Sequence, residues 1–510
     1  MKNLFSLDNL AIVNEKSLSN TADALWEALQ SSLILPLSQT YKIPLFTEEL
    51  EIKLLQVEDV KISYKFLHDR VQQAAYSLIP EEKKQETHLQ IGRLLLQKTS
   101  LLAIEDNIFD IVNQLNIGID LIAIAAEREQ LASLNLIAGR RAKAATAYEA
   151  ALRYLDLGIS LLPENSWHTD YELTLSLYAE AVEVAYLNTE YAHLKTLSDL
   201  VLKQAKRPLD KVKVYETKIQ FHIAQNQMLE AIATALEILK MLGVSLPEQP
   251  NRFGILVNSI STKLNIGAKQ IEDLAQLPRM TDPEKIAAMR ILIAVLVPAF
   301  LTTPNLFPII TFKMVNLSLR YGNSPQAAYG YALYGWLLCG ALGDINSGYQ
   351  FGQLALELLN KFNAQDLSCK VINIYNAFVC HWKEHGKTTI PAFVEALQMS
   401  LEIGNIEYAG YSSLNFCHYT FLIGEHLESV ISSQKPYIEL MHKLKQEYVL
   451  HSINTVRQTV LNLLSESADP RRLVGRAFNE AEMLPIFQAA NIRTSLFMSY
   501  FYKTIALIFI

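Results

Sequence analysis

Cysteine is scarce in this sequence and its few copies are far apart. The 510 residues contain four, at Cys339, Cys369, Cys380 and Cys417. They form no C-x-x-C pair, and the first ten residues include charged side chains and no apolar run of the kind that opens a secretion signal. We therefore expect a protein with reduced thiols and a cytoplasmic location.

Catalytic motifs are also missing. The sequence has no G-x-x-x-x-G-K-[ST] string, in which backbone N–H groups cradle phosphates. It has no H-R-D loop or D-F-G string of a protein kinase, and no His-Glu phosphoacceptor box or glycine-rich ATP lid of a histidine kinase. We expect that this chain is not an enzyme and holds no cofactor of its own.

Charge is low and has no concentrated sign. Charged residues make up 19% of the chain, against about 25% in typical soluble domains, and the net charge is -7. No Lys or Arg occurs from Ser17 to Tyr41, whereas non-specific DNA binding depends on cations that neutralise phosphates. We expect no nucleic-acid partner. The 50% of hydrophobic residues predicts apolar faces that other domains or subunits cover.

One apolar run is long enough to be tested as a membrane span. Residues 291–312 carry no charge before Lys313, and roughly 20 residues suffice to cross a bilayer. Pro298, Pro304 and Pro308 interrupt the run, and the string TTPN around Pro304 predicts a turn between two buried helices. We expect no membrane partner. The apolar end, residues 505–510, is too short for an anchor and predicts a truncated helix.

Residues 62–96 combine strand, helix and turn signals. Apolar residues alternate with polar ones, as in a half-buried strand, at Ile62, Tyr64 and Phe66. An apolar stripe with helical spacing follows, at Val71, Ala74, Ala75, Leu78 and Ile79. Pro80 ends that helix. His68 and Asp69 thus lie at a strand-to-helix junction, where unpaired backbone N–H groups favour anions.

The string HDRVQQAAYSLIP, which begins at His68, carries a resemblance to a known family. Together with Phe66-Leu67, it resembles the winged-helix end of STAND-type signalling ATPases. It is similar to bacterial proteins that join a serine/threonine kinase, an AAA/STAND ATPase with helical repeats, a GAF sensor and a sensor histidine kinase. The resemblance implies that His68 and Asp69 contact a bound nucleotide, ATP or ADP, if an upstream ATPase domain is present. The alternative is that they only cap the helix.

Residues before this junction have the order expected of a winged helix. Apolar spacing predicts a first helix around Leu7–Val13, and Ser19-Asn20-Thr21 predicts the cap of a second. A short strand at Leu33–Pro36 would pair with the strand at 62–66, and the loop between them would be the wing.

Helical repeats are predicted from about residue 81 onward. Ala151, Leu155, Gly158 and Pro163 follow tetratricopeptide spacing, and Gly139 is the small residue that close helix packing needs. A related string returns around Gly243.

A longer repeat supports this interpretation. The pattern G-N-x-x-x-A-x-Y at 322–329 recurs at 404–411, an offset of 82 residues, which two hairpins of about 41 residues fill. We expect the intervening hairpin to consist of helices at 366–382 and 391–403, which turn at His385-Gly386-Lys387. Stacked hairpins form a solenoid with a concave face.

Two side-chain clusters could indicate a ligand. Cys380-His381 and Cys417-His418 are spaced by 37 residues, close to one repeat, and neighbours on a helix rarely share a metal ion, so we expect no metal. Four aromatic residues predict core or concave-face packing in preference to a cofactor site: Tyr329, Tyr331, Tyr334 and Trp336.

We therefore predict a mainly all-α chain: a winged-helix module with a short β-hairpin, then a tetratricopeptide-like α-solenoid. The predicted boundaries are 1–80 for the module, 81–250 for helical repeats, 251–320 for a linker region with Pro-broken apolar helices, and 321–510 for further repeats, truncated at the C-terminus.

By resemblance, the function is that of a non-catalytic regulatory and protein-interaction segment of a signalling ATPase and sensor kinase. Its partners would be the ATPase and kinase domains of that system, with a protein or ligand on the concave face. Two alternatives stay open. One is a winged-helix transcription regulator with a ligand-sensing solenoid, and the other is a non-functional remnant of a split gene.

Overall fold

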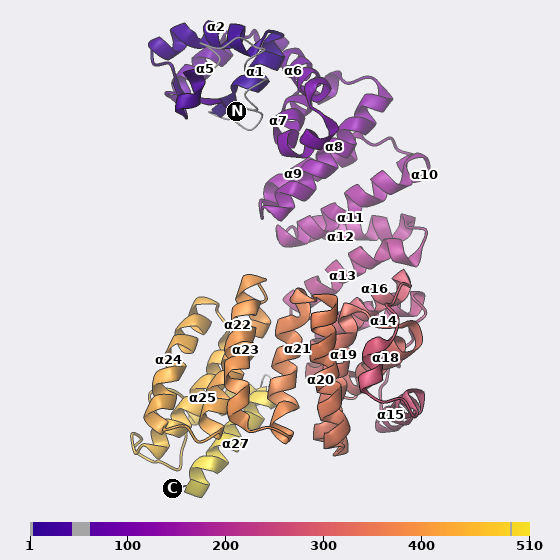
Figure 1. The fold of residues 1–510 in the computed structure, drawn as a ribbon, viewed down its shortest axis with the longest axis vertical. Helices are drawn as coiled ribbons and strands as arrows, with labels where there is room; N and C mark the ends of the chain where they lie inside the picture. Colours follow the sequence, from indigo (N-terminus) through magenta and orange to yellow (C-terminus); the bar gives the residue numbers. More distant parts are fainter. Residues whose placement is uncertain (1–3, 43–61, 490–491, 510) are drawn as a thin grey trace. The chain divides into compact units, whose positions relative to one another are not determined.

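The computed structural model describes residues 4–42, 62–489 and 492–509. They cluster into two compact units, 1–217 and 218–510, with the boundary inside helix α13 (Pro208–Ala224). Both units are helical apart from one small sheet, which confirms the predicted fold class (Figure 1). The four segment boundaries drawn from the sequence stay predictions.

The small sheet has three antiparallel strands in the order β1-β3-β2. The strands are β1 (Leu4–Ser6), β2 (Ile34–Pro36) and β3 (Ser63–Phe66). The predicted pairing of β2 with β3 is confirmed, with Leu35 opposite Lys65, whereas β1 was not predicted. The predicted wing falls mostly in residues 43–61, outside the described residues.

Two helices cover this sheet. They are α1 (Leu7–Asn14) and α2 (Leu18–Gln30), and their shared core with the sheet includes Leu7, Ala22, Ile34, Ile62 and Tyr64. The cap predicted at Ser19-Asn20-Thr21 is wrong. The Ser17 side chain caps α2 instead, accepting the Asn20 backbone N–H at 3.2 Å, because the helix begins one residue later, at Leu18.

The rest of the first unit consists of helices in pairs. They are α5 (Asp69–Ser77), α6 (Lys84–Lys98), α7 (Ile104–Ile117), α8 (Ala125–Ala144), α9 (Tyr148–Leu161), α10 (Ser166–Thr169), α11 (Tyr171–Leu187) and α12 (Tyr191–Gln204). α8 packs along α9, and a Cβ on Gly139 would lie only 2.7 Å from Leu155 Cγ. The predicted need for a small residue at Gly139 is confirmed.

The second unit continues the helical pairs. It holds α14 (Met228–Met241), α15 (Arg252–Ile266), α16 (Pro283–Ala294), α17 (Leu296–Thr302), α18 (Leu306–Tyr321), α19 (Pro325–Leu337), α20 (Ile345–Phe362), α21 (Gln365–Phe378), α22 (Thr389–Glu402), α23 (Ile406–Leu422), α24 (Leu427–Lys443), α25 (Glu447–Leu463), α26 (Glu480–Ala489) and α27 (Arg493–Phe509). The hairpin predicted at 366–382 and 391–403 corresponds to α21 and α22, so that prediction is confirmed.

The long apolar run is divided as predicted. Residues Thr303–Asn305 separate α17 from α18, which confirms the turn at TTPN. Pro283–Thr302, with a break at Val295, is the one stretch among the described residues that is long and apolar enough to cross a membrane. Half of it is buried inside the protein, as in the core helix of a soluble protein, so it is weak evidence for a span.

Many hairpins turn in the same way in both units. The second residue after the first helix has positive φ, as at Thr146, Thr189, Asn226, Gly404 and Lys445. The next N–H then bonds to the carbonyl five residues earlier, for example at 2.9 Å from Ala147 to Ala142 and at 3.0 Å from Gln446 to Met441. This is a Schellman motif, which satisfies the free carbonyls at a helix end. We call these the Schellman turns.

Candidate functional site

The structure places His68 and Asp69 at the junction expected from the sequence. β3 ends at Phe66, His68 occupies the N-cap position with φ -141° and ψ 145°, and Asp69 begins α5. Both side chains are exposed. Within the described residues the His68 side chain makes no capping hydrogen bond, although His68 stands at the N-cap position. Asp69 in the first turn is favoured by the helix dipole. Their contact with a nucleotide stays a prediction.

Helix α5 is lightly packed. None of its residues is buried by the described part of the chain, and Leu78, just after it, is 83% exposed. The apolar stripe found in the sequence is therefore left half-buried or exposed. A helix held by few apolar contacts opens at low free energy.

A hydrogen-bond chain ties α5 to the first helical hairpin. The Tyr76 hydroxyl of α5 lies 3.0 Å from Nε2 of His88 in α6, and Nδ1 of His88 lies 2.5 Å from Oε1 of Gln114 in α7. Because an amide oxygen only accepts, Nδ1–H donates to Gln114, and in the neutral imidazole Nε2 accepts a hydrogen bond from the Tyr76 hydroxyl. His88 is 3% exposed. The sequence analysis did not predict these hydrogen bonds, because the residues that form them are 12 and 26 positions apart.

A second polar cluster joins α8, α11 and α13 in the first unit. Glu180 accepts from Arg140 Nε at 3.0 Å and from Lys143 Nζ at 2.6 Å, and Lys213 Nζ lies 2.8 Å away. Burial alone would raise the pKa of Glu180, but hydrogen bonds from the two lysines outweigh it and lower the pKa to about 2. Glu183 shares both lysines. This cluster therefore links α8, α11 and α13 through ion pairs.

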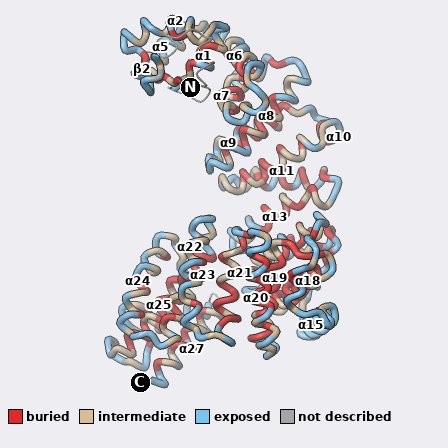
Figure 2. The backbone as a smooth tube through the Cα atoms, viewed as in Figure 1, coloured by how far each residue is buried: buried red, intermediate tan, exposed pale blue. Residues whose placement is uncertain are grey.

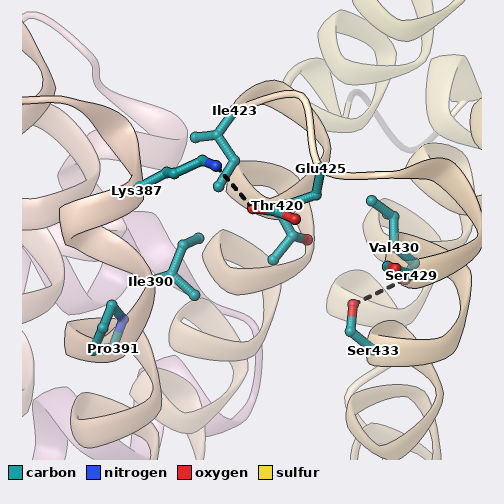
Figure 3. Close-up of a pocket in the computed structure, with 9 residues that line it drawn as sticks. All are labelled: Lys387, Ile390, Pro391, Thr420, Ile423, Glu425, Ser429, Val430 and Ser433. Atoms are coloured by element: carbon teal, nitrogen blue, oxygen red, sulfur yellow. Dashed lines mark hydrogen bonds and ion pairs between the residues drawn. The ribbon is translucent and has the colours of Figure 1, made fainter.

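A groove of about 420 Å³ lies between α22, α23 and α24 (Figure 3). Its walls are mostly apolar, from Ile390, Pro391, Ile423 and Val430. At one end, Lys387 and Glu425 form an ion pair of 3.4 Å between Nζ and Oε1. Such a groove suits an apolar side chain of a partner.

Helix α15 presents an exposed apolar stripe. Five residues at helical spacing, which we call the α15 apolar surface, are exposed by 48–74%: Phe253, Leu256, Val257, Ile260 and Leu264. Figure 2 shows most of this helix in the colour of exposed residues. Contiguous exposed apolar patches usually mark interaction sites. The sequence predicted apolar helices in this region, but periodicity alone does not tell a buried face from an exposed one.

The two other clusters from the sequence lie mostly in the core, except that His381 is exposed and Trp336 is half-buried. Cys417 and His418 are buried, and burial lowers the pKa of His418 to about 3, so its imidazole is neutral. In the described residues, no group of three or more His, Cys, Asp or Glu is placed to hold a metal ion. Tyr329, Tyr331 and Tyr334 are buried, which confirms the predicted core packing for these three of the four aromatic residues.

The fold and surfaces define the class: a helical-repeat protein with a small sheet-containing module and exposed apolar faces. No known family profile matches the chain. It is similar to the hybrid signal transduction histidine kinase G of Dictyostelium discoideum, with 25% identity over 454 residues. The match covers 81% of this chain but only 13% of that protein.

Among solved structures, the chain is similar to a Signal Transduction ATPase with Numerous Domains (STAND) protein with a tetratricopeptide repeat sensor from Pyrococcus horikoshii. The identity is 11%, the TM-score 0.43, and the match covers 98% of this chain and 63% of that one. A likeness this loose carries no argument by itself.

Proposed function

We propose that this chain is a regulatory, protein-interaction segment of a cytoplasmic signalling system in which ATPase and kinase domains do the catalysis. The α15 apolar surface carries the proposal, because a helical-repeat unit that leaves such a stripe exposed is built to receive another protein surface. Similarity to a protein named as a hybrid histidine kinase supports the choice of system. The chain itself is not an enzyme, and ATP or ADP is bound elsewhere in the system.

The second part of the proposal is that the N-terminal module relays partner binding to the nucleotide state of the ATPase segment. We interpret residues 1–80 as a winged-helix module, with His68 and Asp69 facing the nucleotide of an ATPase segment. Helix α5 is lightly packed and is held to α6 by Tyr76 and His88. A partner that binds one arrangement of the repeats better than another would bias the position of α5, and with it the nucleotide state.

The proposed interaction of the α15 apolar surface is tested by its effect on a histidine kinase. This kinase is one encoded in the same polypeptide or in a neighbouring gene. Autophosphorylation is measured with the wild-type chain and with Leu256→Lys/Ile260→Lys on α15. We expect the double variant to abolish the effect of the chain on the kinase, because two charges would have to be desolvated at the interface. The matched control is Val394→Lys on α22, where the wild-type valine is 43% exposed. The proposal is contradicted if the wild type, the double variant and Val394→Lys all regulate the kinase equally.

The relay is tested in a polypeptide with a nucleotide-binding ATPase segment in front of residue 1. We expect His68→Ala to speed ADP release by roughly tenfold, the value of one charge-assisted hydrogen bond. His426→Ala serves as control, since that side chain is 79% exposed at the start of α24. Unchanged release in His68→Ala removes the relay and leaves the α15 interaction standing.

A further inference from the structure

The second unit contains a hollow lined by cationic side chains, which has no role in the proposed function. It measures about 390 Å³ and lies between α15, α16 and α18, next to the turn that follows α14. Small-molecule sites commonly measure roughly 300–1,000 Å³. Lys285, Lys313 and Arg320 line it, and among the described residues no Asp or Glu does. The hollow is therefore strongly cationic although the chain as a whole is acidic.

Two of the three cations differ in how far the fold engages them. Lys285 Nζ donates to the backbone carbonyl of Leu242 at 2.6 Å, which satisfies the end of α14, and Glu284 Oε2 lies 3.9 Å away. Arg320 stands in the last turn of α18, where a positive charge is favoured by the helix dipole. Lys285 is therefore engaged within the fold, whereas the exposed guanidinium of Arg320 has no hydrogen bond or ion pair to another described residue.

Lys313 is not engaged in the way that Lys285 is. It lies in the middle of α18, is half-buried, and makes no hydrogen bond or ion pair with any described residue. Burial lowers the pKa of its ammonium group, so the folded chain bears a desolvation cost that nothing in the described residues offsets. A half-buried cation without a partner is stabilised when an anion occupies the adjacent space.

The other lining groups indicate which anion fits. Asn265 Nδ2 donates to Asn316 Oδ1 at 2.8 Å, and Asn316 Nδ2 donates to Thr262 Oγ1 at 2.8 Å, so both amides are held in fixed orientations. The ring of Tyr321 has Lys285 Nζ at 5.8 Å and Arg320 Cζ at 5.3 Å from its centroid. The site thus combines fixed polar groups, an aromatic ring and several cations.

We infer that this hollow binds the phosphate group of a small phosphorylated molecule, with Lys313 and Arg320 as its main cationic contacts. A phosphate monoester carries about -1.5 to -2 charges near neutral pH and offers three acceptor oxygens. It can therefore use two cations at once, and a guanidinium matches phosphate geometry with two parallel hydrogen bonds. A carboxylate carries one charge and two acceptor oxygens, so it offers Lys313 and Arg320 less charge and fewer acceptors than a phosphate does.

The test is isothermal titration of the full chain with inorganic phosphate, AMP and glycerol 3-phosphate, and with acetate at equal ionic strength. We expect saturable binding of at least one phosphate compound and none of acetate. Lys313→Gln should weaken it by about tenfold or more, and Lys313→Arg should retain it. The matched control is Lys435→Gln on the exposed face of α24, which removes the same charge outside the hollow.

The three phosphate compounds separate the possible sources. Equal affinity for all three means that the phosphate group alone is recognised. Tighter binding of AMP identifies a nucleotide, and tighter binding of glycerol 3-phosphate identifies a lipid headgroup or sugar phosphate. Absence of saturable binding overturns the inference, and so does equal loss in Lys313→Gln and Lys435→Gln. Thermal unfolding of each variant shows that it is folded.

Discussion

One buried link between neighbouring helices in the first unit differs in its chemistry from one in the second. In residues 1–217, the carboxylate of Glu180 gathers Arg140, Lys143 and Lys213 from two other helices. In residues 218–510, the fully buried hydroxyls of Tyr329 and Tyr408 meet at 2.5 Å between α19 and α23. The Glu180 link therefore depends on a charge that pH can remove, whereas the link between Tyr329 and Tyr408 is neutral.

The largest expected effect is in the core of the second unit. Phe351 is 2% exposed, and its ring centroid lies 4.8 Å from that of Tyr334. Phe351→Ala should lower the free energy of unfolding by about 3–5 kcal/mol, because it leaves a cavity between α19 and α20. The measurement is urea unfolding followed by circular dichroism. Phe253→Ala, where the ring is 74% exposed, should change the free energy of unfolding by less than about 0.5 kcal/mol. Equal losses of unfolding free energy in the two variants would show that Phe351 does not lie in a tightly packed core.

Next in size is the link in the first unit. Glu180→Gln should cost about 2–3 kcal/mol at pH 7, because two lysines lose a charged acceptor in a site where Glu180 is only 10% exposed. The ordinary pKa of this carboxyl is 4.5 and its folded pKa is about 2, so its stabilisation is present above pH 4.5 and is lost as pH falls towards 2. The difference between wild type and variant, measured by unfolding at pH 7 and pH 3, should therefore shrink. A constant difference would contradict the role of the charge.

The neutral link gives the contrasting result. Tyr329→Phe should cost about 1–2 kcal/mol, because the buried Tyr408 hydroxyl loses its partner. Tyr329→Phe/Tyr408→Phe should cost less than the sum of the two single changes, since no hydroxyl is then left unpaired. Unfolding measured at pH 5 and pH 8 should give the same differences. Burial raises the pKa of Tyr329, so neither hydroxyl ionises there. A marked pH dependence would remove the contrast between the Glu180 link and the link of Tyr329 with Tyr408.

The smallest effect should be equal in both units, because both use Schellman turns. Thr146 and Lys445 have φ of 58° and 54°, where a side chain is disfavoured. Thr146→Gly and Lys445→Gly should each stabilise the chain by about 0.5–1 kcal/mol. The control is Gly404→Ala, at φ 72°, which should destabilise it by at least as much. Thermal unfolding measures all three, and opposite signs for the two glycine variants would show that the turns differ.

Regular features of the fold could be predicted from the sequence. Periodic apolar residues indicated the helices, and Gly139 and the 82-residue offset indicated hairpins, because close helix packing constrains residue size at fixed positions. Strand β1 escaped prediction because Leu4–Ser6 is too short to show alternation. The Schellman turns escaped as well, since Thr146 and Lys445 carry no glycine signal.

The candidate site could be predicted only in part. The strand-to-helix junction at His68 follows from a change of period along the chain, which is a local signal. The links from Tyr76 to His88 and from Glu180 to Lys213 depend on which helix faces which, and one sequence does not reveal that. The exposure of α15 and the missing partner of Lys313 are likewise properties of packing. Apolar spacing is the same whether a stripe is covered or bare.

The Schellman turns have a consequence for how this protein can evolve. Each turn is closed by main-chain hydrogen bonds within its own hairpin, and its left-handed position accepts Thr, Asn, Lys or Gly. The hydrogen bonds that close a hairpin thus lie within that hairpin. Each repeat of such an array contacts mainly its neighbours. Gene duplication or deletion of about 40 residues can therefore lengthen or shorten the array by one hairpin. Relatives of this chain should differ by whole hairpins more readily than by changes within them.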